Sequence, residues 1–183
     1  TDATNLRASE LGDAGHAEGA VVGADRQTAG KGRLGRHWVS PPEVNLYTSV
    51  LLRPPILPHD GPQLTFLSAV ATAWAVGDAS GLSPTVKWPN DILLDGKKVA
   101  GLLNEMNAET EGVRYIVLGI GVNLNMEASQ FPADLRYPAT SVALEKGAKV
   151  SRLAFARCLY RYLDRLYLTY LREGFAPIVA EWE

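Results

Sequence analysis

Three cations alternate with three glycines in the short segment 27–38: Lys31, Arg33 and Arg36 carry the charge, and the segment contains no acidic residue. Glycine lets the backbone pass close to a ligand and adopt positive φ. Arginine offers a bidentate fork for phosphate, and lysine offers a compact charge. The segment therefore predicts an anion-binding loop with phosphate as its ligand, and a solvated basic connection is the alternative.

Two familiar nucleotide motifs do not fit this loop. Gly30-x-Gly32-x-x-Gly35 matches the dinucleotide fingerprint in letters, but that fingerprint needs a helix opening on its glycines, and the residues that follow, Arg-His-Trp-Val-Ser-Pro-Pro, start a helix poorly. A Walker A loop is excluded because Lys31 precedes glycine and not Ser or Thr. The three histidines show no metal-ligand spacing, so no protein metal site is expected.

A second group of charged residues occurs at 86–105. Lys87 and Asp91 belong to the run Val-Lys-Trp-Pro-Asn-Asp, and Lys98 starts a strand-like run. A hairpin would bring Asp91 and Lys98 to neighbouring strand positions, where the carboxylate could orient the ammonium near an anionic reactant. An ordinary cross-strand ion pair is the alternative. A third run, Gly119-Ile-Gly-Val-Asn123, combines glycines that permit close ligand approach with an amide.

Apolar spacing and turn residues indicate the elements that must position these groups. Short spacing between the later strands predicts antiparallel hairpins, and Trp88 is expected in the core. Strands are expected at 20–25, 45–53, 85–88, 92–95, 99–106 and 113–120. Helices are expected at 5–14 with Thr4 as N-cap, at 64–81 with one apolar face, at 151–174 and at 176–182.

Composition sets the class of protein. The chain has 183 residues, of which 46% are hydrophobic and 21% charged, and this describes one globular domain. A net charge of −2 and a pI near 5.9 argue against a general nucleic-acid binder. The single cysteine and the absence of a long apolar run predict a reducing, cytoplasmic location and no membrane span.

The order and separation of these motifs resemble the catalytic domain of biotin protein ligase, also called biotin–[acetyl-CoA-carboxylase] ligase. The resemblance spans residues 1–183. It rests on the glycine-rich basic loop ending in Trp38, the Lys-Trp-Pro-Asn-Asp box, the strand that begins at Lys98, and the Gly-x-Gly-x-Asn element. It implies an α+β fold of the class II aminoacyl-tRNA synthetase and biotin synthetase type. In that fold a mixed, largely antiparallel sheet has helices mainly on one face.

The resemblance also implies a two-step reaction. Biotin and ATP form biotinyl-5′-adenylate, with Mg²⁺ carried mostly on ATP oxygens, and a lysine of a biotin carboxyl carrier protein then takes the biotinyl group. It implies that Arg33, Lys98, Asp91 and Lys87 take part in catalysis. The implied biotin contacts are Ala3, Thr4, Asn5, Gln27, Gly30, Lys31, Gly32, Arg33, Lys98, Gly101 and Leu102. The implied ATP contacts are Lys31, Arg33, Arg36, Trp38, Lys98 and Asn123, and for Trp38 a loop anchor packed on the core is the alternative.

Some features depart from the family pattern. Ala3 stands where serine is usual, and Glu43 stands where a loop glycine is frequent. The SH3-like carboxy-terminal domain and the amino-terminal winged helix of many relatives are expected to be absent, so no operator binding is predicted. Lipoate ligation and a non-catalytic biotin sensor are the alternative functions. A homodimer is neither predicted nor excluded by the sequence.

Overall fold

The computed structural model describes residues 1–135 and 137–181. Its centre is a six-stranded sheet in the order β1-β2-β6-β5-β4-β3, and each of the five strand pairings in the described residues is antiparallel. One isolated parallel bridge joins Lys98 to Ala139. The strands are β1 (Val21–Ala24), β2 (Leu46–Leu52), β3 (Thr85–Lys87), β4 (Asp91–Leu94), β5 (Lys97–Glu109) and β6 (Gly112–Val122).

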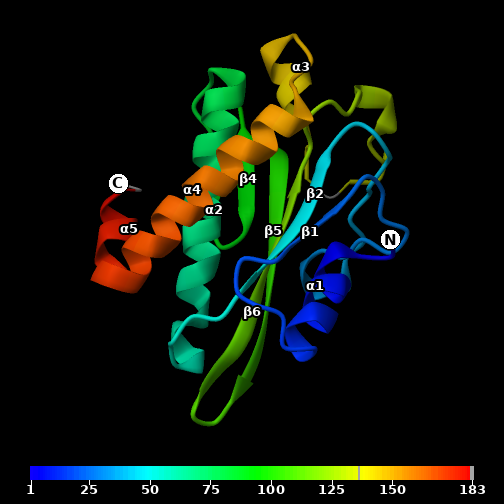
Figure 1. Ribbon diagram of the computed structural model, residues 1–183. Coiled ribbons are helices and arrows are strands. Elements are labelled where there is room, and N and C mark those ends of the chain that lie inside the picture. Colours follow the sequence, from blue (N-terminus) through cyan, green and yellow to red (C-terminus); the bar gives the residue numbers. More distant parts are fainter. Residues whose placement is uncertain (136, 182–183) are drawn as a thin grey trace.

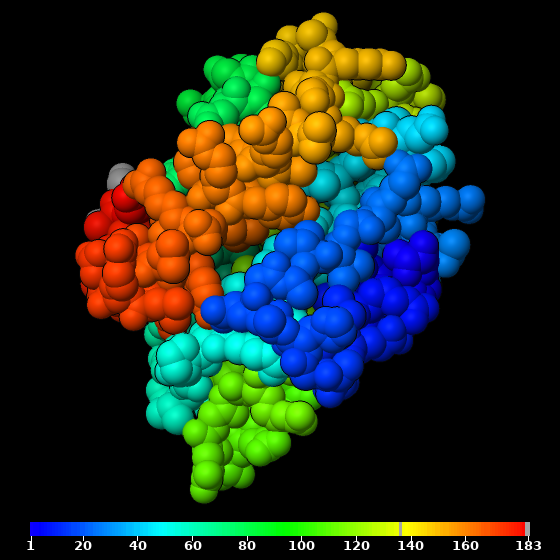
Figure 2. All heavy atoms as spheres, viewed as in Figure 1, coloured from blue at the N-terminus to red at the C-terminus, as the bar shows by residue number. Residues whose placement is uncertain are grey.

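Helices cover the two faces of the sheet unequally (Figure 1). The long helices α2 and α4 lie on one face, and the shorter α1 packs on the other against β1, β2 and β6. Figure 2 shows α4 along the surface and the tip of the β5–β6 hairpin projecting beyond it. The helices are α1 (Thr4–Asp13), α2 (Gly61–Ser80), α3 (Val142–Lys146), α4 (Arg152–Glu173) and α5 (Ala176–Ala180). The predicted α+β fold is confirmed.

The prediction of one apolar face is wrong for α2. Buried residues occur all round this helix, and they include Ser68 and Thr72 as well as Leu64 and Leu67. The reason is that α2 lies between the sheet and α4, so it has neighbours on both sides. Ser68 and Thr72 satisfy their hydroxyl groups by donating to backbone carbonyls of the same helix.

The start of α1 also differs from the prediction. Thr4 is the first helical residue and not the N-cap, and Ala3 at the cap position has no side chain able to accept a hydrogen bond. Gln27 takes over that role, because its Oε1 accepts from the Thr4 backbone N–H at 2.9 Å. The long helix expected at 151–174 is found as α4, and Ser151 is its N-cap, because Ser151 Oγ accepts from Ala154 N.

Most predicted strands are found within two or three residues of their expected ends. The turn residues of the sequence predict the β4–β5 turn at Gly96-Lys97, but the turn is Asp95-Gly96, both with positive φ. The predicted helix at 176–182 reaches Ala180, and its last expected residue lies outside the described residues. The prediction that Trp88 is in the core is wrong: it is 64% exposed, and its ring centre lies 6.3 Å from that of Phe66.

Glu43 adopts a left-handed backbone conformation with φ of 66°. A side chain in this region costs about 1–2 kcal/mol, which explains why glycine suits the position. We expect Glu43→Gly to raise the free energy of unfolding by up to about 1 kcal/mol in urea denaturation. The Glu43 N–H that donates to Asp25 Oδ1 at 3.0 Å is kept in this variant. Glu43→Ala retains the Cβ and should not raise the free energy of unfolding. If both variants raised it equally, the effect would be assigned to the lost carboxylate.

Candidate active site

A β-bulge brings Lys98 to the site. Strands β4 and β5 pair Asp91 with Gly101 but Leu93 with Lys98, so Val99 has no opposite residue. A bulge inserts one residue and re-aims the side chains beyond it. Lys98 therefore lies on the same face as Asp91 and Gly101. The predicted ion pair is confirmed, with Lys98 Nζ 2.6 Å from Asp91 Oδ1 and both side chains largely shielded from solvent.

The basic loop folds back on itself beside this pair. Gly32 N donates to Arg36 O at 2.7 Å, Lys31 forms a bridge with His37, and the tip turns through Leu34 at φ 60°. This turn leaves the three cations of the loop exposed at its surface. Their charges are thus available to an anion.

Trp38 closes the loop over the sheet. Its indole lies on two glycines: a Cβ at Gly101 would be 2.8 Å from the ring, and a Cβ at Gly121 would be 2.7 Å from Nε1. Lys98 Nζ lies 5.3 Å from the ring centre. The Nε1 donor is buried without a partner among the described residues. Trp38 thus anchors the loop, which was the alternative given for it, and it also forms part of the site.

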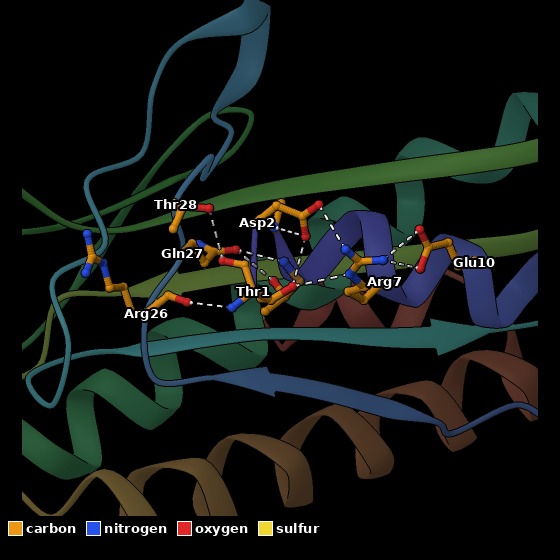
Figure 3. Close-up of polar contacts among 9 residues, drawn as sticks. Thr1, Asp2, Arg7, Glu10, Arg26, Gln27 and Thr28 are labelled. Atoms are coloured by element: carbon orange, nitrogen blue, oxygen red, sulfur yellow. Dashed lines mark hydrogen bonds and ion pairs between the residues drawn. The ribbon is translucent and has the colours of Figure 1, made fainter.

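A chain of polar side chains lies under this loop. Gln27 Oε1 also lies 3.2 Å from the Thr4 hydroxyl, and Gln27 Nε2 donates to Ser40 Oγ, which donates to the Trp38 carbonyl. Asn5 Nδ2 donates to Leu103 O, at 2.9 Å. Figure 3 shows Gln27 beside the first residues of the chain. These contacts tie the start of α1 to both ends of the basic loop.

The sequence did not predict two members of this network. Ser49 Oγ lies 2.6 Å from Asn5 Oδ1 and 2.8 Å from Thr4 Oγ1, and Glu105 Oε2 accepts from Asn5 Nδ2 at 2.7 Å. Ser49 is fully buried in β2. A serine inside a strand of apolar residues was the signal that could have drawn attention to it.

Two adjoining cavities meet at Arg33, Trp38 and Lys98. The first is narrow, with about 50 Å³ of free space, and most of the predicted biotin contacts line it. Its lining comprises Ala3, Thr4, Asn5, Gln27, Lys31, Gly32, Arg33, Trp38, Asn90, Lys98, Gly101, Leu102, Leu103, Gly119, Ile120 and Gly121. Trp38 fills much of the space above the two glycines, which explains the small volume.

The second cavity is larger, about 320 Å³, and contains predicted ATP contacts. Arg36, Asp91 and Asn123 line it, together with five residues that also line the first cavity, namely Gly32, Arg33, Trp38, Asn90 and Lys98. The rest of its lining was not predicted. It includes Leu34 of the basic loop and, from a later segment without a regular apolar period, Met126, Phe131, Pro132, Leu135, Tyr137 and Ala139.

Three predicted site residues have other partners. Lys87 lines neither cavity, and its Nζ lies 3.7 Å from the centre of the Tyr137 ring. Asn123 lines the second cavity, but its amide donates to Thr140 O and lies near Asn45, so its contact with adenine stays a prediction. Gly30 is buried, and a Cβ there would be 2.5 Å from the Trp38 carbonyl oxygen. Gly30 therefore serves the packing of the loop.

One carboxylate near the site, that of Glu145, has a lowered pKa. Partial burial works to raise the pKa of the Glu145 carboxyl, but hydrogen bonds from Lys97 and Thr140 outweigh it and hold the pKa below its usual value.

Across residues 1–135 and 137–181, no group of three or more His, Cys, Asp or Glu side chains could hold a metal ion.

Comparisons with known proteins agree with this geometry. Bifunctional ligase/repressor BirA of Bacillus subtilis is 41% identical over 180 residues, covering 98% of this chain and 55% of BirA. Biotin–[acetyl-CoA-carboxylase] ligase of Paracoccus denitrificans is 38% identical, covering all of this chain and 76% of that protein. The chain thus spans about half the length of the BirA relatives.

A solved structure gives the same fold. Biotin protein ligase from Aquifex aeolicus, in complex with biotin and ATP, superposes with a TM-score of 0.83 at 27% identity, covering all of this chain and 73% of that one. The profile of the biotin/lipoate A/B protein ligase family matches residues 2–123, the part that carries the loop, the ion pair and the glycine strands. This chain belongs to the biotin/lipoate A/B protein ligase family.

Proposed function

We propose that this chain is the catalytic part of an ATP-dependent ligase that joins biotin to a lysine of a biotin carboxyl carrier protein. The observation that carries the proposal is the pair of adjoining cavities with Arg33 and Lys98 at their junction. Most residues that the family resemblance assigns to biotin line the narrow cavity, and several of those assigned to ATP line the larger one. The relatives named as biotin ligases support this choice of acid.

In the first step an oxygen of the biotin carboxylate attacks the α-phosphorus of ATP. The bond from that phosphorus to the bridging oxygen breaks, and pyrophosphate leaves. Both reactants are anions, so fixed cations at the junction offset their repulsion and hold them in line. Lys98 supplies one charge, held in place by Asp91, and Arg33 supplies another. Mg²⁺ enters on the ATP phosphates.

In the second step the ε-amine of the carrier lysine attacks the acyl carbon, and AMP leaves. The exposed loop tip and the open second cavity give the incoming amine a route to the junction. None of the helices in the described part combines the length and apolar character needed to cross a lipid bilayer. We place the reaction in the cytoplasm, where ATP is available.

Biotin-dependent exchange of labelled pyrophosphate into ATP tests this function. We expect exchange with biotin and at most weak exchange with lipoate at equal concentration. Strong lipoate-dependent exchange would reassign the acid. Biotin binding without any exchange would instead support a sensor.

The loop 27–40 is expected to close over the reactants. Small-molecule sites usually enclose roughly 300–1,000 Å³, whereas the first cavity has about 50 Å³ of free space. The loop and Trp38 must therefore move away for biotin to enter before they close over the reactants. We expect tryptic cleavage after Lys31, Arg33 and Arg36 to slow severalfold when biotin and ATP are present. Mass spectrometry of the fragments measures the cleavage rates. Cleavage after Lys149, in another exposed segment, should keep its rate. Equal loop cleavage with and without ligands would contradict closure.

A further inference from the structure

The backbone of Lys98 is held by a segment far along the chain. Strand β6 pairs with β5 only as far as Ala100. Beyond that point the Lys98 N–H donates to Pro138 O at 2.8 Å, and the Thr140 N–H donates to Lys98 O at 2.9 Å. Beyond the bulge at Val99, Lys98 pairs with Leu93 of β4 on one side, and this parallel bridge supports its backbone on the other side.

One carboxylate oxygen ties together both sides of that bridge. Glu145 Oε1 accepts from Lys97 Nζ at 2.6 Å and from the Thr140 hydroxyl. Lys97 directly precedes Lys98, and Thr140 is the residue whose N–H donates to Lys98. The Glu145 side chain is only 14% exposed and that of Lys97 is 36% exposed, so these charge-assisted hydrogen bonds are partly shielded from solvent.

Helix α3 gives Glu145 a fixed base. The Ser141 hydroxyl donates to Met126 O and also accepts from Leu144 N at the start of the helix. The Val142 N–H donates to Asn123 O, which anchors the helix to the end of β6. The carboxylate is therefore attached to the sheet and not to a free loop.

We propose that Glu145 is a positioning residue for Lys98, which it holds through Lys97 and Thr140. This rests on the proposed function, in which Lys98 meets the reacting groups. Glu145 lines neither cavity, so its effect must pass through the bridge. Thr4 and Gln27, two of the implied biotin contacts that line the first cavity, lie on other elements, so biotin binding should change little.

The kinetic test compares Glu145→Ala with a charge exchange. A misplaced catalytic group can cost up to about a hundredfold, so we expect kcat for pyrophosphate exchange to fall roughly tenfold in Glu145→Ala, with KM for biotin within about twofold. The double variant Lys97→Glu/Glu145→Lys restores the ion pair and should recover much of the rate lost by Lys97→Glu alone. Glu181→Ala removes an ion pair of similar length, to Arg165, and should leave kcat unchanged.

Amide hydrogen exchange by NMR provides a readout that does not depend on activity. In Glu145→Ala the Lys98 and Thr140 N–H groups should lose protection, while the N–H groups at the centre of β6 keep theirs. Two results would overturn the proposal. One is an unchanged kcat together with unchanged protection in Glu145→Ala. The other is a fall in KM and kcat that Glu181→Ala reproduces. If the unmodified protein shows no biotin-dependent exchange, the proposed function fails, and the protection of Lys98 still decides the role of Glu145.

Discussion

Lys98→Ala is expected to slow formation of biotinyl-adenylate by roughly 2 to 4 kcal/mol in barrier, which is roughly thirty- to nine-hundred-fold in rate. The ammonium lies where the two cavities meet and is held 2.6 Å from Asp91 Oδ1, so no solvent reorganisation is needed when anionic charge builds up between carboxylate and phosphate. Arg33→Ala should cost a similar amount, because Arg33 lines the same junction. Biotin-dependent pyrophosphate exchange measures both.

Matched variants separate this effect from a general loss of positive charge. Lys149→Ala and Arg157→Ala remove exposed cations that line neither cavity, and both should keep the rate. Lys98→Arg keeps the charge but replaces a compact ammonium by a wide planar group, so it should recover only part of the activity. An unchanged exchange rate in Lys98→Ala would remove Lys98 from the mechanism.

The sequence predicted those parts of the site that depend on local signals. The short spacing of the strand-like runs predicts the hairpin that brings Asp91 and Lys98 together, although its turn is Asp95-Gly96 and not the predicted Gly96-Lys97. The glycine and cation pattern likewise marked the loop that carries Arg33. Such features involve neighbouring residues in the chain, so they can be inferred without knowledge of the packing.

The face on which Lys98 lies could not be inferred from alternation. Residues 98 and 101 are three apart, and a regular strand would place them on opposite faces. The bulge at Val99 reverses this, and it depends on pairings with β4 and with residues 138–140. The apolar wall formed by Phe131, Pro132, Leu135, Tyr137 and Ala139 was missed for the same kind of reason, since its position is set by tertiary contacts.

Trp88 shows how composition alone misleads. A large aromatic residue in a strand-like run is usually buried, but β3 is a three-residue strand at the edge of the sheet. Helix α2 makes contact with β3 yet leaves most of the indole uncovered. The burial of an aromatic residue thus depends on strand order, which the local sequence does not give.

Gly119→Ala is expected to damage both folding and the first cavity. A Cβ at Gly119 would lie 2.1 Å from Asn5 Oδ1 and 2.6 Å from the Leu103 carbonyl oxygen. Asn5 cannot move aside easily, because its amide donates to Leu103 O and its Oδ1 lies 2.6 Å from the Ser49 hydroxyl. Overpacking of this kind costs roughly 1–3 kcal/mol in the free energy of unfolding. Urea denaturation measures this cost.

Biotin affinity should fall in the same variant, because Asn5 and Gly119 both line the first cavity. Gly112→Ala is the matched control on the same strand: its Cβ would meet only Ile56 O, at an ordinary 3.8 Å. It should keep both stability and biotin affinity, as measured by isothermal titration calorimetry. If Gly119→Ala were as stable as Gly112→Ala and bound biotin equally well, β5 and α1 could separate enough to admit a methyl group. The close contact of Asn5 with the sheet would then not be what shapes the cavity.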